Sequence, residues 1–256
     1  MLTRTAPFAA VIQKVQAGEA DASQLRQLAQ ALVEAPNAAT VLAQHSAGKI
    51  LLDGIQATQQ REVVAKLRAA VEDPATREPT IQRILEEAWW IFGGRFIDKA
   101  QRRNLTVLNQ VDIPLIRADG VLQVVELKTA NIPDLVVKYR NHYIVGPKVN
   151  EAVGQVTNYL RDFDEQRHII EENFGIECRR AFATVLIGHP RYVRDVTAEE
   201  VTKALRTYNA HLSRIEVITY GELIAGAEGA LSLHDRQEEL EPEQSEWDAP
   251  WEGASF

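Results

Sequence analysis

The sequence predicts an α/β protein, a core of strands and helices that follows an N-terminal α-helical region. Three observations lead to this class. Apolar residues recur at helical spacing through residues 1–75, the apolar pattern changes to every second residue over 104–128, and helical and strand patterns then alternate to residue 231. The chain has 256 residues, 45% of them apolar and 25% charged, which is typical of a soluble protein of one or two domains.

The first 75 residues form the predicted N-terminal region, with a role in regulation or assembly. They are rich in alanine and glutamine, and their apolar positions follow helical spacing, as in Leu25, Leu28 and Leu32. Pro79 suits the first turn of a further helix over 79–92, because its fixed φ matches the helix and its missing N–H is not needed there.

A β-hairpin is predicted over residues 104–128. Val111, Ile113 and Leu115 alternate with other residues in the first strand, and Ala118 to Gly120 give a turn signal. The second strand is predicted over 121–128.

The rest of the chain predicts alternating helices and strands. Residues 129–148 contain prolines and a glycine and are predicted as a connection. The predicted helices cover 150–163, 199–212 and 221–231, and the predicted strands cover 181–188 and 215–220. The predicted division is therefore a helical region over 1–75, an α/β domain over 76–233 and a tail over 234–256.

Composition excludes several classes of function. The single cysteine, Cys178, excludes an intramolecular disulfide and a cysteine-based zinc site, and its place in an apolar stretch predicts a buried, unreactive thiol. No apolar run is long enough to span a membrane and no signal peptide is indicated, so we expect a cytoplasmic protein. No phosphate-binding loop of the Walker type is present, which argues against ATP hydrolysis.

The formal charge of -8 is concentrated in the tail. Residues 234–256 contain eight acidic residues and one arginine, so the rest of the chain is nearly neutral and can carry a local basic surface. The tail also contains Trp247, Trp251 and Phe256. Acidic, solvated disorder is one interpretation, and docking or an autoinhibitory cover over a basic cleft is the other.

Two carboxylates and a lysine meet in the predicted hairpin. Asp112 lies in the first strand, and Glu126 and Lys128, two residues apart, project from one face of the second. Pairing of the strands places Asp112 close to Glu126. Two neighbouring carboxylates repel unless a cation lies between them, and oxygen ligands suit Mg²⁺ or Mn²⁺. A salt-bridged strand end is the alternative interpretation.

Further polar residues favour a catalytic site over that alternative. Gln155 and Tyr159 lie four apart on one face of the helix after the hairpin, and Glu78 begins the helix before it. We expect a set of cations around the hairpin to contact DNA phosphates: Arg102, Arg103, Lys138, Arg140 and Lys148.

The order and spacing of these residues resemble a known nuclease superfamily. Val-Asp112-Ile, Val-Val-Glu126-Leu-Lys128 and the helix with Gln155 and Tyr159 are similar to the PD-(D/E)XK nucleases, and more narrowly to the Shedu anti-phage defence nucleases. The resemblance covers about residues 78–225. It implies a restriction-endonuclease-like core.

The resemblance also implies the role of each residue. Asp112, Glu126 and the backbone carbonyl of Leu127 become metal ligands, Lys128 the catalytic lysine and Gln155 a supporting active-site residue. Glu78 becomes a helix-borne acid, with Glu86 and Glu87 as rivals.

The function that follows is metal-dependent cleavage of DNA in anti-phage defence by a homo-oligomer, a dimer or a tetramer. One alternative is a DNA-binding module that keeps the fold without cleaving. Another is a nuclease of the same superfamily that acts on RNA or on junctions in repair.

Overall fold

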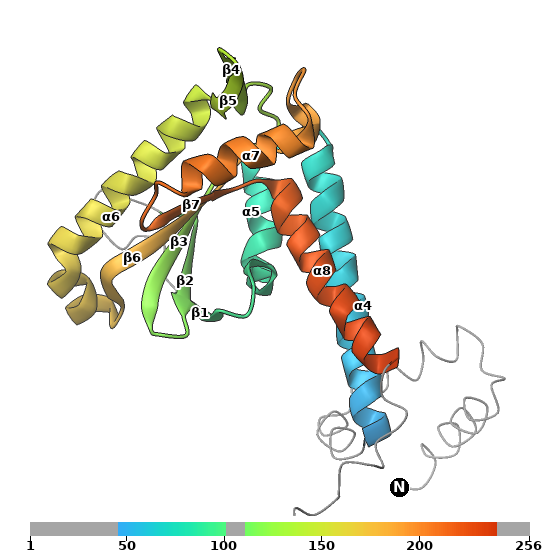
Figure 1. Cartoon of the computed structure of the whole chain (residues 1–256). Helices are drawn as coiled ribbons and strands as arrows, with labels where there is room; N and C mark the ends of the chain where they lie inside the picture. The colour runs from blue at the N-terminus through green and yellow to red at the C-terminus, as the bar shows by residue number, and fades with distance from the viewer. Residues whose placement is uncertain (1–45, 101–110, 240–256) are drawn as a thin grey trace, which may run out of the picture. The chain divides into compact units, whose positions relative to one another are not determined.

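The computed structural model of the chain describes residues 46–100 and 111–239, with side chains placed from residue 53 to residue 233 within those ranges (Figure 1). The chain divides into two compact units, residues 1–60 and residues 61–256. Predictions for residues 1–45, for Arg102 and Arg103, and for the tail from residue 240 lie outside the described residues. All of the fold described below belongs to the second unit, apart from the first part of helix α4.

A five-stranded mixed sheet forms the centre of the second unit. Its strands lie in the order β1-β2-β3-β6-β7, in which β2 pairs antiparallel with both β1 and β3, and β6 pairs parallel with both β3 and β7. The bounds are β1 Phe96–Lys99, β2 Ile113–Arg117, β3 Val121–Leu127, β6 Glu177–Leu186 and β7 Ile215–Ile218. The α/β class predicted from the sequence is therefore confirmed.

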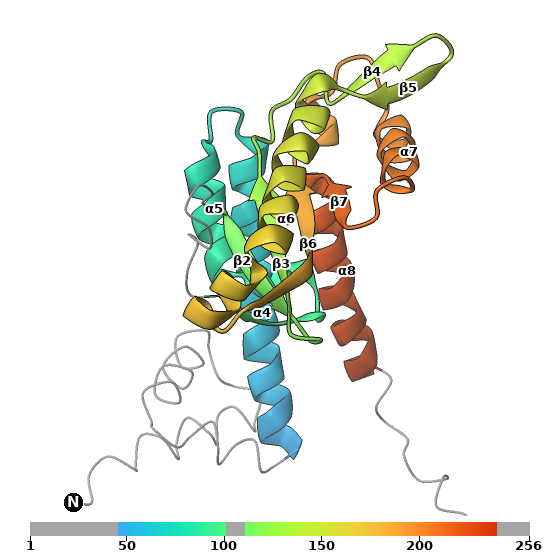
Figure 2. The ribbon, with the colours of Figure 1, turned by 90° about the vertical axis from the view of Figure 1, so that its left-hand side faces the viewer.

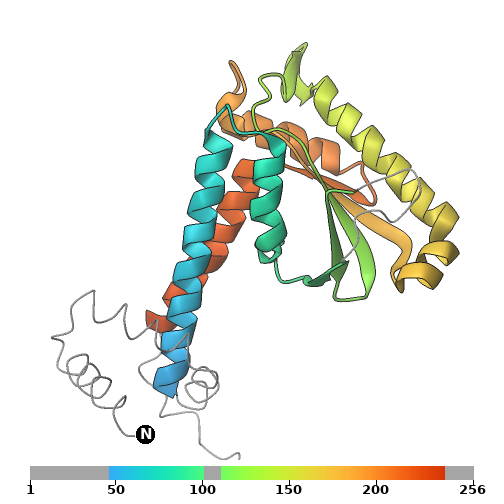
Figure 3. The same ribbon diagram turned by 180° about the vertical axis from the view of Figure 1, so that it is seen from behind.

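Helices cover both faces of this sheet (Figures 1 and 3). Helices α6 and α7 pack on one face, and α5, α8 and the second half of α4 pack on the other. The bounds are α4 Ser46–Glu72, α5 Glu78–Glu87, α6 Pro147–Phe174, α7 Ala198–Asn209 and α8 Tyr220–Glu239, with short 3-10 turns η1 Trp89–Phe92 and η2 Pro190–Tyr192. Among the described residues, no helix is long and apolar enough to cross a membrane.

The predicted hairpin is present as β2 and β3. Its turn contains Gly120 at φ 81°, a conformation that glycine adopts without strain. The Gly120 N–H donates to the Arg117 carbonyl at 2.9 Å, and Asp119 accepts from the Val121 N–H at 3.2 Å. A side chain and the backbone thus hold the turn that sets the register of the two strands.

The prediction that residues 129–148 form a connection is wrong in part, because this segment contains a second hairpin. Strands β4, Val136–Tyr139, and β5, His142–Val145, pair as a separate two-stranded sheet. Their turn has Arg140 at φ 56°, where glycine or asparagine is the usual residue. The turn therefore lacks the sequence signal that normally marks a hairpin. Strand β1 was not predicted either.

Helix α6 is longer than the predicted 150–163. It begins at Pro147 and continues to Phe174, where Gly175 at φ 66° ends it with its N–H on the Glu171 carbonyl at 2.8 Å. Its last three turns are mostly polar and exposed, so they carry little of the apolar periodicity that identifies a helix.

Cys178 is buried, as predicted. Its side chain has 0% exposure and lies 3.5 Å from the Phe163 carbonyl, and burial raises the pKa of the thiol to about 11. A thiol this hard to ionise is expected to be a poor nucleophile.

Substitution by alanine is expected to have opposite effects on stability at two glycines, one just before α6 and one within it. A Cβ at Gly146 would lie 1.8 Å from the Asp134 carbonyl oxygen, whereas one at Gly154, exposed within α6, meets nothing within 4 Å. We expect Gly146→Ala to lower the free energy of unfolding by about 2–3 kcal/mol and Gly154→Ala to raise it by roughly 0.5–1 kcal/mol. Urea denaturation of both variants checks this, and equal effects would contradict the close approach at Gly146.

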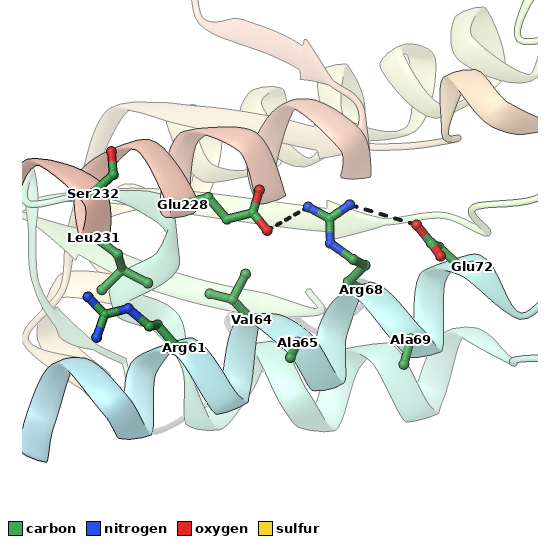
Figure 4. Close-up of a pocket in the computed structure, with 9 residues that line it drawn as sticks. All are labelled: Arg61, Val64, Ala65, Arg68, Ala69, Glu72, Glu228, Leu231 and Ser232. Carbon is green, nitrogen blue, oxygen red and sulfur yellow. Dashed lines mark hydrogen bonds and ion pairs between the residues drawn. The ribbon is translucent and has the colours of Figure 1, made fainter.

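Helix α8, which begins with Tyr220, packs against α4. Arg68 on α4 bridges Glu228 on α8 at 2.5 Å and Glu72 at 3.7 Å (Figure 4). The hollow that Figure 4 shows is about 460 Å³ in volume, and none of its nine lining residues is a predicted site residue. Half-exposed ion pairs of this kind contribute at most about 1 kcal/mol, so the buried apolar cluster that contains Leu67, Leu223 and Ile224 carries more of the packing.

Candidate active site

Asp112 lies immediately before β2, not within the strand as predicted, and Glu126 lies near the end of the paired strand β3. The ladder pairs Ile113 with Val125, and the same register extended by one residue places Asp112 opposite Glu126. Asp112 Oδ2 also accepts a hydrogen bond of 2.8 Å from the Leu127 N–H. This bond fixes the Asp112 carboxylate beside the residue that follows Glu126.

Glu126 and Lys128 form an ion pair at the end of β3. The Lys128 Nζ donates to Glu126 Oε1 at 2.6 Å, and the Glu126 side chain is only 5% exposed. Burial raises the pKa of Glu126, the Lys128 hydrogen bond lowers it in part, and the charge of Asp112 raises it further. Burial lowers the pKa of Lys128, but the Glu126 hydrogen bond and the neighbouring carboxylates outweigh it and raise the pKa overall. Lys128 is therefore a cation at neutral pH.

Glu78 lies in the same electrostatic environment. It is the first residue of α5 and is half-buried. Burial raises the pKa of Glu78, the charge of Asp112 raises it further, and Lys128 lowers it. Among its predicted rivals, Glu86 accepts a hydrogen bond from Gln82 at 3.0 Å and Glu87 is exposed. The structure thus brings Glu78 to Asp112 and Lys128.

Helix α6 presents Gln155 and Tyr159 to the Glu126 side of the sheet. The Gln155 Nε2 donates to the Tyr159 hydroxyl, so the partner of this amide in the structure is a neighbour on its own helix. Burial raises the pKa of Tyr159, the Gln155 hydrogen bond lowers it, and the charge of Glu126 raises it. Tyr159 therefore lies within the field of the carboxylate pair.

Two contacts to the site were not predicted from the sequence. Gln82 Nε2 donates to the Asp112 backbone carbonyl at 3.2 Å, and the Tyr220 hydroxyl donates to the Lys128 carbonyl at 2.7 Å. Burial raises the pKa of Tyr220 well above its ordinary value, and the charges of Glu78 and Asp112 add to this, so the phenol stays a hydrogen-bond donor. Tyr220 contacts a residue 92 positions earlier, which local sequence patterns do not encode.

Tyr220→Phe is expected to loosen the backbone at Lys128. The tyrosine is fully buried, so removal of its hydroxyl leaves the Lys128 carbonyl without this donor. We expect the free energy of unfolding to fall by about 1–2 kcal/mol. Tyr208→Phe is the matched control, because its hydroxyl bonds Asn150 at 3.0 Å on the surface and its loss should cost less than about 0.5 kcal/mol. Urea denaturation compares them, and equal costs would contradict a structural role for the Tyr220 hydroxyl.

Three of the five predicted phosphate-binding cations lie among the described residues. Lys138 and Arg140 are exposed on the β4–β5 hairpin. Lys148 lies in the first turn of α6, and its Nζ is 2.8 Å from the Glu151 carboxylate. An exposed pair of this kind is weak, so Lys148 can exchange Glu151 for a phosphate at little cost.

The donor set of the site fits a small, hard cation. In the described part of the chain, no three side chains of histidine, cysteine, aspartate or glutamate gather closely enough to hold a metal by themselves. Asp112 and Glu126 provide two carboxylates, and the Leu127 carbonyl is the third predicted ligand. These are oxygen donors, which Mg²⁺ and Mn²⁺ prefer, and a cation between the carboxylates would relieve the repulsion that raises the pKa of Glu126.

Comparison with known proteins identifies the family of the chain. A search of curated proteins finds no match. The family model described as Shedu protein SduA, C-terminal, matches residues 75–224. This range is more than half of the chain and contains the residues that meet at the site, namely Glu78, Asp112, Glu126, Lys128, Gln155 and Tyr220. The chain therefore belongs to the Shedu family.

Proposed function

We propose that this protein is a metal-dependent endodeoxyribonuclease with a PD-(D/E)XK core that acts in anti-phage defence. One observation carries the proposal. At the ends of two paired strands, the carboxylates of Asp112 and Glu126 meet with the Lys128 ammonium 2.6 Å from Glu126, inside the region that matches the Shedu family.

In this proposal Asp112, Glu126 and the Leu127 carbonyl hold Mg²⁺ or Mn²⁺. When bound, the cation polarises the scissile phosphate and lowers the pKa of the attacking water. The Leu127 N–H restrains Asp112 for this role, because it donates to one carboxylate oxygen and fixes the orientation of the side chain.

Lys128 acts as a charged donor in the proposed reaction. Its ammonium is held by Glu126 and kept protonated by the carboxylates around it, so it can donate to a phosphate oxygen as negative charge develops there. Glu78 and Gln155 are proposed to line the same site, where the Gln155 amide would orient water or a phosphate in exchange for its hydrogen bond to Tyr159.

The proposed partner is DNA, bound by a homo-oligomer. Lys138, Arg140 and Lys148 are proposed to contact backbone phosphates, because they are exposed and lie on or beside the hairpin that precedes α6. Arg102 and Arg103 complete the proposed set.

Incubation of supercoiled plasmid with the full chain tests the function. We expect nicked or linear plasmid with Mg²⁺ or Mn²⁺ and unchanged plasmid in a chelator. Equal cleavage in the chelator would contradict the proposed metal dependence. Binding without cleavage under every metal condition would instead support a non-cleaving module, and preferential cleavage of competing RNA or junctions would support a repair or RNA nuclease.

A further inference from the structure

The β4–β5 hairpin, which leads into the helix that carries Gln155, has an exposed aromatic face. Strand pairing puts Tyr139 opposite His142 and Val137 opposite Ile144, so these four side chains share one face. Tyr139 is 49% exposed and Ile144 is 40% exposed, which is unusual for large apolar side chains. We call these four residues the hairpin platform.

The opposite face of the hairpin holds the platform in place. Val136 and Val145 are buried there and Tyr143 packs against the same core. The Gly146 N–H donates to the Leu135 carbonyl at 2.8 Å and closes the base of the hairpin. Since two isolated strands are only marginally stable, this packing is what makes the platform a preformed surface.

The hairpin has the charge of a nucleic-acid-binding element. Residues 136–145 contain Lys138, Arg140 and no acidic residue. The Arg140 guanidinium lies 5.4 Å from the Tyr139 ring centre, and the Tyr139 and His142 rings are 5.6 Å apart at 68°. Arg140 occupies a left-handed conformation, with φ 56°, at the turn of the hairpin. Cations beside exposed aromatic rings suit a polyanion whose bases can stack.

The location of the platform places such a ligand near the catalytic residues. The hairpin leads directly into α6, and Figure 2 shows it extending beyond the start of that helix. Gln155 lies eight residues after Pro147, or about 12 Å along the axis. The tip of the hairpin is about 13 Å further, by the length of a four-residue strand. A strand of a few nucleotides covers this distance.

We propose that the hairpin platform stacks with unpaired bases of DNA next to the cleavage site. The inference rests on the proposed function for its location beside the active site. Bases in a duplex have their faces covered by their neighbours, so only single-stranded or locally opened DNA can use Tyr139 in this way. Lys138 lies on the other face of the hairpin and would contact phosphates of paired and unpaired DNA alike.

Fluorescence anisotropy with the full chain in a chelator tests this, because no cleavage is needed. The probes are a labelled 20-nucleotide DNA strand and the same strand in a blunt duplex. We expect Tyr139→Ala to weaken binding of the single strand by about tenfold and of the duplex by less than about twofold, whereas Tyr139→Phe keeps both. Lys138→Gln should weaken both to the same extent, and Ile169→Ala, 58% exposed on α6, should change neither.

Unchanged single-strand binding by Tyr139→Ala would overturn the proposal, as would an equal loss for the two probes. A change of oligomeric mass in Tyr139→Ala on light scattering would also overturn it, because a second copy of the chain would then cover the platform. Failure of the nuclease proposal gives a different result, since the plasmid stays uncut by the parent protein while the selective loss of single-strand binding persists.

Discussion

Glu126→Gln is expected to reduce the rate of DNA cleavage on the order of a thousandfold. The change keeps the shape of the side chain and an oxygen that can accept from Lys128, but it removes the charge from a ligand of the proposed cation. The side chain is 5% exposed, so water cannot replace the lost carboxylate freely. Single-turnover cleavage of a labelled duplex with Mg²⁺ measures the effect, and DNA binding in a chelator should change by less than about twofold.

Glu165→Gln provides the control for this result. Glu165 is a glutamate on α6 whose side chain is 66% exposed, and its charge should not affect the reaction. A Glu126→Gln protein that cleaves at the rate of the Glu165→Gln protein would remove Glu126 from the active site.

Phe163→Ala is expected to lower the free energy of unfolding by about 3–5 kcal/mol. Phe163 lies on α6 with 0% exposure, in the core between this helix and the sheet. Removal of the ring loses the burial of its apolar surface and leaves a cavity that the neighbouring strands cannot fill. The midpoint of urea denaturation should fall while its slope stays the same.

Ile169→Ala is the matched comparison on the same helix. Its side chain is 58% exposed, so its removal should change the free energy of unfolding by less than about 0.5 kcal/mol. A similar decrease in the free energy of unfolding for the two variants would mean that both sides of α6 are equally buried. This result would contradict the packing in the structure.

The sequence predicts the β2–β3 hairpin well because its signals are local. The turn has Asp119 and Gly120, and the period-two pattern sets which residues share a face. The register then follows, and with it the approach of Asp112 to Glu126. The pattern of motifs was also sufficient to predict the family that the comparison finds.

The parts that sequence reasoning missed depend on contacts between distant residues. The β4–β5 hairpin turns through Arg140 in a conformation usual for glycine, and its stability comes from packing on the core rather than from turn propensity. Tyr220 reaches Lys128 only because β6 and β7 bring the start of α8 to the end of β3. Neither feature leaves a periodic signal in the sequence.

The Mg²⁺ dependence of the cleavage rate in Asp112→Asn and in the parent protein is the most direct test of the proposed active site. If Asp112 and Glu126 hold the cation that drives cleavage, the parent rate rises to saturation with Mg²⁺, and Asp112→Asn either fails to cleave or needs at least roughly tenfold more Mg²⁺. If Asp112→Asn cleaves with the rate and the Mg²⁺ dependence of the parent, the carboxylate pair is not the metal site and the proposed mechanism is wrong.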